Sequence, residues 1–248
     1  MTLTMVGRLA ECVLVSYRTP AGSVRGWLPA GLELVTRGEW AFWNIVACRV
    51  EGMRPAGLPS WLGLDYHHVA YRLLVRARVA GATVDGLYFL RSDADNGLIA
   101  ASGNWLSDFR FHRAAISVQG TGRDLALRVR SSGRRGGEAE LEVENADGAV
   151  LAEDSCFASA AEAAGFLKYR PLGLAVDERT GDVKLAEVFR DEARWREQPL
   201  RVARARWEFL EDLGQGEARL EWASRVAPID YRWRLGRRLA AGRSGKMC

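Results

Sequence analysis

Alternation of apolar and polar residues along much of the chain predicts β-strands. The segment 67–79 alternates, and a turn at Gly81 leads into a second predicted strand over 85–93. The segment 39–50 is rich in aromatic and β-branched residues, which favours a buried strand. Further strands are expected over 12–17, 108–119, 124–131 and 138–145.

Tight turns and short connections indicate how these strands pair. Glycine-rich residues 132–137 and Asp147-Gly148 separate consecutive predicted strands, which favours antiparallel pairing in a sheet that curls into a barrel or sandwich. Short helices are expected over 23–28, 96–105 and 159–167, with Asp95 or Asn96 as the N-cap of the second. A hairpin around 177–181 and strand-like runs over 200–210 and 218–235 complete the chain.

No linker divides the chain, so we expect one α+β domain over residues 1–248, with 240–248 as a frayed tail. Apolar residues make up 48% of the chain and charged residues 27%, which provides material for a sizeable core. No segment approaches the ~20 apolar residues that span a bilayer. Together with an N-terminus that lacks a signal-peptide pattern, this predicts a cytoplasmic protein without membrane contact.

The basic residues do not indicate nucleic-acid binding. The net charge is +4, but arginine is spread along the whole chain and accompanied by 31 acidic residues, whereas nucleic-acid binders cluster it on one face. The cysteines, Cys12, Cys48, Cys156 and Cys248, form no C-x-x-C pair and have no histidine at zinc-finger spacing. We therefore expect reduced thiols, no nucleic-acid partner, no cofactor and no structural metal.

Several motifs together resemble one known family. They are LPAGL at 28–32, the segments 66–75 and 86–95, and FLKYR at 166–170. Over about residues 13–232 the chain resembles the YqjF-like family of unknown function (domain of unknown function 2071). That family in turn resembles acetoacetate decarboxylase in fold, which implies a curved, mainly antiparallel β-structure around a deep polar pocket.

The resemblance does not extend to the decarboxylase chemistry. In the decarboxylase-type relatives a lysine forms a Schiff base with a keto acid, and a glutamate that follows a Tyr-x pair on an adjacent strand assists. Here the corresponding strand, 108–114, has no lysine, and His68 stands at the position that matches the glutamate. Arginine cannot replace the lysine because it stays protonated.

Alternate residues on a strand share a face, and this suggests an anion pocket. Arginines in such a pocket would bind a small carboxylate in two-point contact. His68 and His112 would act as acid or base near neutral pH. The segment 51–63 is a loop and a candidate lid at the mouth. The predicted site residues are His68, Arg72, Arg91, Asp93, Arg110 and His112, with Trp105 near the mouth.

Other interpretations of the same residues remain open. Asp65, Asp93, Asp95 and Asp108 could neutralise the arginines, which would leave an ion-pair network in a non-catalytic sensor or oligomeric scaffold. A metal set of His112, one of the adjacent histidines 67 and 68, and Asp93 or Asp108 is chemically sensible, but no motif spacing supports it. Nine tryptophans suit core packing or, for some of them, a subunit interface of a homo-oligomer.

Overall fold

The computed structural model describes residues 3–79, 82–120, 124–131, 137–146, 148 and 151–239. Some sequence expectations fall outside these residues. They are the turn at Gly81, the turn residues 132–136, Asp147, and the tail 240–248 with its Cys248.

Strands dominate the described residues, and all of them belong to one 13-stranded sheet. Their bounds are β1 (Leu3–Pro20), β2 (Leu32–Leu34), β3 (Trp40–Pro55), β4 (Leu64–Val79), β5 (Ala82–Ala94), β6 (Phe111–Gln119), β7 (Leu125–Ser131), β8 (Ala139–Asn145), β9 (Leu172–Val176), β10 (Val183–Arg190), β11 (Glu197–Trp207), β12 (Arg219–Val226) and β13 (Ile229–Leu239).

The helices are few and short. They are α1 (Ala21–Val24), α2 (Gly97–Leu106), α3 (Ala160–Leu167) and α4 (Glu208–Asp212), with 3₁₀ turns η1 (Arg25–Trp27) and η2 (Ser60–Leu62). The side chain of Asn96, one of the two N-cap residues expected from the sequence, caps α2 by accepting from the backbone N–H groups of Leu98 and Ile99. None of the described helices has the length and apolar character needed to cross a membrane.

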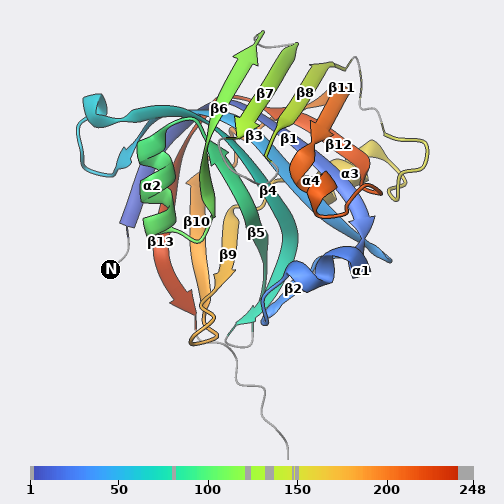
Figure 1. Ribbon diagram of the computed structural model, residues 1–248, viewed down its shortest axis with the longest axis horizontal. Coiled ribbons are helices and arrows are strands. Elements are labelled where there is room, and N and C mark those ends of the chain that lie inside the picture. The colour runs from blue at the N-terminus through green and yellow to red at the C-terminus, as the bar shows by residue number, and fades with distance from the viewer. Residues whose placement is uncertain are drawn as a thin grey trace, which may run out of the picture.

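The sheet branches, and this branching builds the interior. Strands β1, β3, β4 and β5 pair in that order. One arm, β6–β7–β8–β11–β12, connects β5 back to β1, and a second arm, β9–β10–β13, makes the same connection separately. Pairing is antiparallel except where β5 meets β6 and β9. Figure 1 shows the first arm at the top of the molecule and β9, β10 and β13 lower down.

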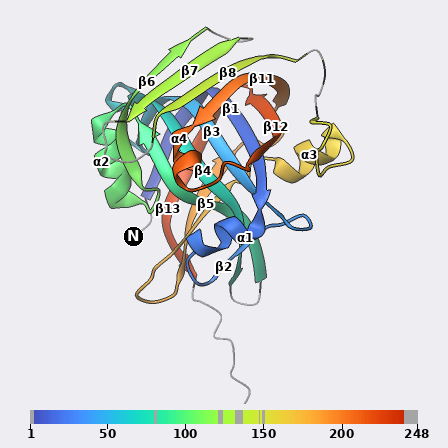
Figure 2. The ribbon, with the colours of Figure 1, turned by 45° about the vertical axis from the view of Figure 1, so that its right-hand side comes forward.

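Each side of the β1–β3–β4–β5 layer is covered by its own apolar core. The first core cluster contains Trp43, Tyr71 and side chains of β7, β8 and β11. The second contains Phe42, Phe89 and side chains of β10 and β13. Figure 2 shows β6, β7 and β8 arching over the layer from one side. Because both faces are covered, β3 is buried continuously over residues 41–48 instead of alternating.

The fold class predicted from the sequence is confirmed, and individual boundaries differ. The strand expected over 12–17 extends over 3–20, because β1 pairs with β3, β12 and β13 along its length. The single run expected over 218–235 is two strands, β12 and β13, interrupted at Ala227-Pro228. Proline has no N–H for a strand ladder, and the Ala227 N–H donates to the Arg196 carbonyl oxygen.

Candidate functional site

A small, largely buried cavity lies in the second core, between β1, β3, β4 and the β10–β13 side of the sheet. Its volume is about 30 Å³. Its polar lining comes from His68 and Arg72 on β4, Tyr169 after α3, and Arg190 at the end of β10. The remaining wall residues are Leu9, Cys12, Val46, Cys48, Phe89, Val188, Trp195, Tyr231 and Trp233.

Arg72 is buried in this cavity among neutral groups. Arg72 is 2% exposed, and its guanidinium donates to the backbone oxygen and the side-chain oxygen of Asn44. Its carbon lies 5.1 Å from the ring centre of Tyr169 and 5.5 Å from that of Phe89. Burial lowers the pKa of Arg72 from its usual range, but a guanidinium remains charged at neutral pH. No carboxylate of the described residues forms an ion pair with it.

His68 shares the cavity and is uncharged near neutral pH. Its ring stacks on Phe111 with 5.2 Å between the ring centres. Burial, and then the charge of Arg72, lower the pKa of His68 to about 3. Its Nε2 atom is buried and has no hydrogen-bond partner among the described residues. The neutral imidazole therefore has a buried nitrogen that still needs a hydrogen-bond partner.

Arg190 stacks on two aromatic rings at one side of the cavity. The Arg190 guanidinium carbon lies 3.4 Å from the ring centre of Trp195 and 4.9 Å from that of Tyr169. Its Nε donates to Glu192 at 2.7 Å, so its charge is balanced. Two more buried atoms of lining residues, Arg190 Nη1 and Trp233 Nε1, have no hydrogen-bond partner among the described residues.

Among the described residues, the lining of the cavity provides no usable covalent nucleophile. Burial raises the pKa of the Cys48 thiol to about 12, and burial likewise raises that of Cys12, so both are protonated and unreactive. Lys168 and Lys184 lie outside the cavity, in ion pairs with Glu192 and Asp108. Lys246, the remaining lysine, is outside the described residues.

Arg91 and Asp93 lie on the opposite face of the central layer. Arg91 donates through two nitrogens to the Asp93 carboxylate, at 2.8–3.1 Å, and both side chains are buried. Asp93 pairs with His112 across the parallel β5–β6 ladder. Burial, and then the charge of Arg91, lower the pKa of His112. The structure thus separates these three residues from His68 and Arg72.

A β-bulge explains the separation. On β5, Phe89 lies opposite Arg72 but Arg91 lies opposite Tyr71, so Leu90 is an extra residue in the pairing. Directly paired residues of antiparallel strands point to the same side, which places Arg91 and Asp93 on the side of Tyr71. The strict alternation that the sequence suggested for this strand does not hold here, although Arg91 and Asp93 do share a face.

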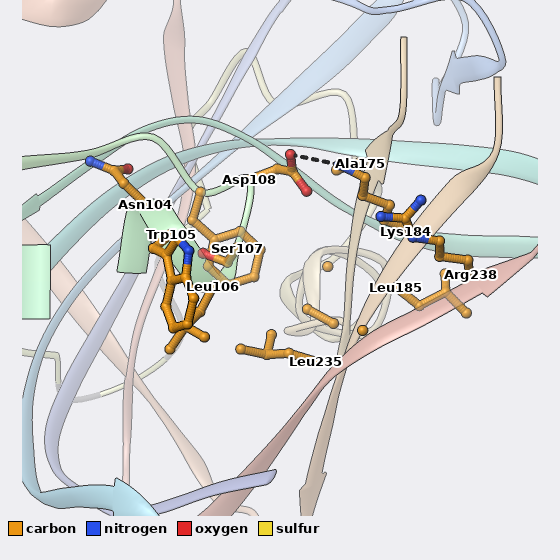
Figure 3. A pocket seen from close by; sticks show the side chains of 14 residues that line it. Asn104, Trp105, Leu106, Ser107, Asp108, Ala175, Lys184, Leu185, Leu235 and Arg238 are labelled. Atoms are coloured by element: carbon orange, nitrogen blue, oxygen red, sulfur yellow. Dashed lines mark hydrogen bonds and ion pairs between the residues drawn. The ribbon is translucent and has the colours of Figure 1, made fainter. Parts of the chain in front are cut away.

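The other predicted site residues lie at the surface. Arg110 precedes β6 and has a φ of 54°, which interrupts the alternation expected over 108–112, and it donates to the Tyr88 hydroxyl at 2.7 Å. Trp105 is 86% exposed. It lines a surface cleft of about 220 Å³, where Figure 3 shows it on one side and Lys184 and Arg238 on the other.

Sequence reasoning missed much of the cavity lining. Tyr169 belongs to the FLKYR motif, so the sequence offered some indication of it. Arg190 and Trp233 carried no such indication, because β10 and β13 reach the cavity only where the second arm of the sheet pairs back onto β1. Among the described residues, no group of three His, Cys, Asp or Glu side chains is arranged to hold a metal ion.

The comparisons with known proteins agree with this architecture. A family model described as an uncharacterized conserved protein, domain of unknown function 2071 (DUF2071), matches residues 7–214. The chain belongs to this family. No curated protein matches it in sequence.

Solved structures show the fold of this DUF2071 member. An acetoacetate decarboxylase-like enzyme from Sphingomonas wittichii RW1 has a TM-score of 0.58 at 16% identity, covering 96% of this chain and 92% of its own. The enduracididine biosynthesis enzyme MppR, complexed with the condensation product of pyruvate and imidazole 4-carboxaldehyde, has a TM-score of 0.60 at 14% identity, covering 98% of this chain and 90% of its own. An acetoacetate decarboxylase has a TM-score of 0.58 at 18% identity, covering 98% of this chain and 91% of its own. At these identities the likeness shows an acetoacetate decarboxylase-like fold.

Proposed function

We propose that the protein binds a small organic carboxylate, of the keto-acid class, in the cavity around Arg72. The observation that carries the proposal is the buried guanidinium of Arg72, which has no carboxylate partner among the described residues. A buried charge is costly unless it is paired, and a guanidinium fork matches a carboxylate in two-point contact. A bound carboxylate would supply the missing counter-charge.

The buried polar atoms around Arg72 support a ligand rich in oxygen. Trp233 Nε1 is only a donor, Arg190 Nη1 is a donor, and neutral His68 either donates or accepts at Nε2. A keto oxygen beside the carboxylate offers acceptors to such donors. The neighbour MppR, which shares the fold, has been solved complexed with pyruvate. Pyruvate is therefore the first probe to use.

The proposed chemistry excludes a Schiff base and centres on His68. Neither Lys168 nor Lys184 lines the cavity, and the Cys48 thiol is protonated. The charge of Arg72 is one of the two causes that lower the pKa of His68. An anion bound at Arg72 offsets that charge, so binding raises the pKa of His68 and makes it a better base. Proton abstraction next to the keto group is the reaction that this arrangement suits.

Calorimetric titration of pyruvate into wild-type protein and into Arg72→Met tests the binding. Loss of a charged, bidentate contact of about 1.5–3 kcal/mol should weaken binding roughly tenfold to a hundredfold. Arg78→Met is the matched control, because Arg78 lies on the same strand with a side chain 76% exposed, and it should bind as wild type does. The uncharged methyl ester of pyruvate should not bind. Equal affinity in Arg72→Met would contradict the proposal.

Binding without turnover is the second candidate. It is favoured by the pKa of about 3 for His68, which makes the imidazole a weak base before an anion is bound. The two are separated by following deuterium exchange into the methyl group of pyruvate by NMR. Catalysed exchange that disappears in His68→Gln, with binding retained, supports proton transfer. If pyruvate binds but the protein does not accelerate deuterium exchange into its methyl group, the protein is a non-catalytic sensor.

A further inference from the structure

A surface cleft lies next to the wall of the cavity. It is bounded by residues 104–109 at the end of α2 and beyond, and by parts of β9, β10 and β13 (Figure 3). The cleft holds about 220 Å³, against about 30 Å³ for the cavity. A cavity of that size has room for about two waters. A ligand whose carbon chain extends beyond the cavity therefore depends on what separates the two spaces.

Two stacked aromatic rings form that separation. Phe89 lines the cavity and Phe109 lines the cleft, and their ring centres lie 3.9 Å apart at an interplanar angle of 20°. Trp233, another cavity residue, meets Phe109 edge-on at 5.2 Å. On the cavity side, Phe89 lies beneath the Arg72 guanidinium. Phe109 is thus the outer ring of a partition whose inner ring contacts the proposed carboxylate site.

The surroundings hold this partition in place. Gly173 packs against it, and a Cβ at this glycine would lie 3.2 Å from Phe109 and 3.3 Å from Phe89. Phe109 itself is 4% exposed and belongs to residues 107–110, which lie between α2 and β6 outside any helix or strand. The next residue, Arg110, has the only positive φ of a non-glycine residue in the described ranges. Strained backbone of this kind persists only where the surrounding structure enforces it.

We propose that Phe109 is the residue that determines the chain length of the bound carboxylate, by closing the cavity off from the cleft. The proposal rests on the proposed function, because it assumes a carboxylate at Arg72. It assigns the wild-type protein to short-chain acids, whose carbon skeleton ends before the Phe89–Phe109 stack. A smaller side chain at position 109 removes the ring on which Phe89 stacks, so that Phe89 can turn into the vacated space and the two spaces join to admit a longer chain.

The test is the affinity of linear monocarboxylates, from acetate to octanoate, measured by calorimetry. Wild-type affinity should stop rising at a short chain and then fall. Phe109→Leu should move this limit to longer acids, with binding about fourfold tighter for each methylene that the joined space buries. Phe109→Ala should move it further. Phe157→Leu is the matched control, because Phe157 is equally buried but lines neither space, and it should keep the wild-type limit.

The outcomes separate this inference from the function on which it rests. An unchanged limit in both Phe109 variants, with short acids still bound, would overturn the role of Phe109 and leave the carboxylate site intact. The same shift in Phe157→Leu would overturn it as well, because loosening of the core would then be the cause. If no acid binds to wild type or to either variant, the carboxylate site itself fails and this inference fails with it.

Discussion

Arg72 on β4 and Arg91 on β5 are buried arginines on neighbouring strands, and the structure surrounds them differently. Arg91 faces the first core and makes a two-nitrogen contact with Asp93. Arg72 faces the second core, where its partners are Asn44, Tyr169 and an aromatic ring. One charge is neutralised within the protein, and the other is not neutralised by any described residue.

The difference distinguishes the Arg91 ion pair from the proposed carboxylate site at Arg72. An ion pair such as Arg91–Asp93 fixes the packing of the strands that carry it, and it offers a ligand nothing to bind. A buried guanidinium held by neutral groups costs stability and is retained where it has another use. The ion pair therefore lies on one side of the layer, at Arg91 and Asp93, and the proposed anion pocket lies on the other side, at Arg72.

The largest effect is expected from Arg91→Met, which leaves Asp93 buried without its partner. Breaking a buried pair in this way should cost about 3–5 kcal/mol of unfolding free energy, measured by urea denaturation. Burial already raises the pKa of Asp93, so without Arg91 the folded state should favour the protonated acid more strongly. The deficit should therefore shrink as the pH falls towards the ordinary carboxyl range.

A double variant provides the control for that measurement. Arg91→Met with Asp93→Leu removes both charges and should recover most of the lost stability. If Arg91→Met alone costs under about 1 kcal/mol, Arg91 is not the structural charge that the comparison requires.

A smaller, pH-dependent effect is expected from His68. Its pKa is lowered to about 3 in the folded protein, from an ordinary value of 6.5, so the unfolded chain takes up a proton first as the pH falls. The contribution of His68 to stability is present above pH 6.5 and is lost as the pH falls towards 3, by on the order of a few kcal/mol. His68→Gln should reduce the loss of stability across this window, as measured by urea denaturation at a series of pH values.

The cause of that shift can be checked in the same experiments. Arg72→Met should raise the pKa of His68, followed by NMR of the imidazole, because one of the two causes is removed. An unchanged His68 pKa in Arg72→Met would mean that the two groups do not share one cavity.

The smallest effect is expected from Tyr169→Phe. The Tyr169 ring packs against the Arg72 guanidinium, whose carbon lies 5.1 Å from the ring centre, and removal of the Tyr169 hydroxyl should weaken pyruvate binding about fivefold through poorer orientation of the guanidinium. Tyr88→Phe is the matched control, since the Tyr88 hydroxyl accepts from Arg110 at the surface. If calorimetry finds the same loss of pyruvate affinity in both variants, Tyr169 does not contribute to the binding site.

Sequence patterns predicted the strands, the capped helix α2 and the pairing of His68 with Arg72 on one face. These features depend on local alternation and capping, which are readable along the chain. The positions of Arg91 and Arg110 were not predictable in this way. A single bulge at Leu90 and a positive φ at Arg110 each interrupt the alternation, and neither has a distinctive residue type. Arg190 and Trp233 reach the cavity only through long-range closure of the sheet.

The most direct test of the central claim is the unfolding free energy of Arg72→Met in the absence of any carboxylate. If Arg72 is held for a ligand, replacing this buried charge by an apolar side chain should leave stability within about 1 kcal/mol of wild type or increase it. A loss as large as that of Arg91→Met would show that Arg72 is a structural charge with an internal partner, and would contradict the account.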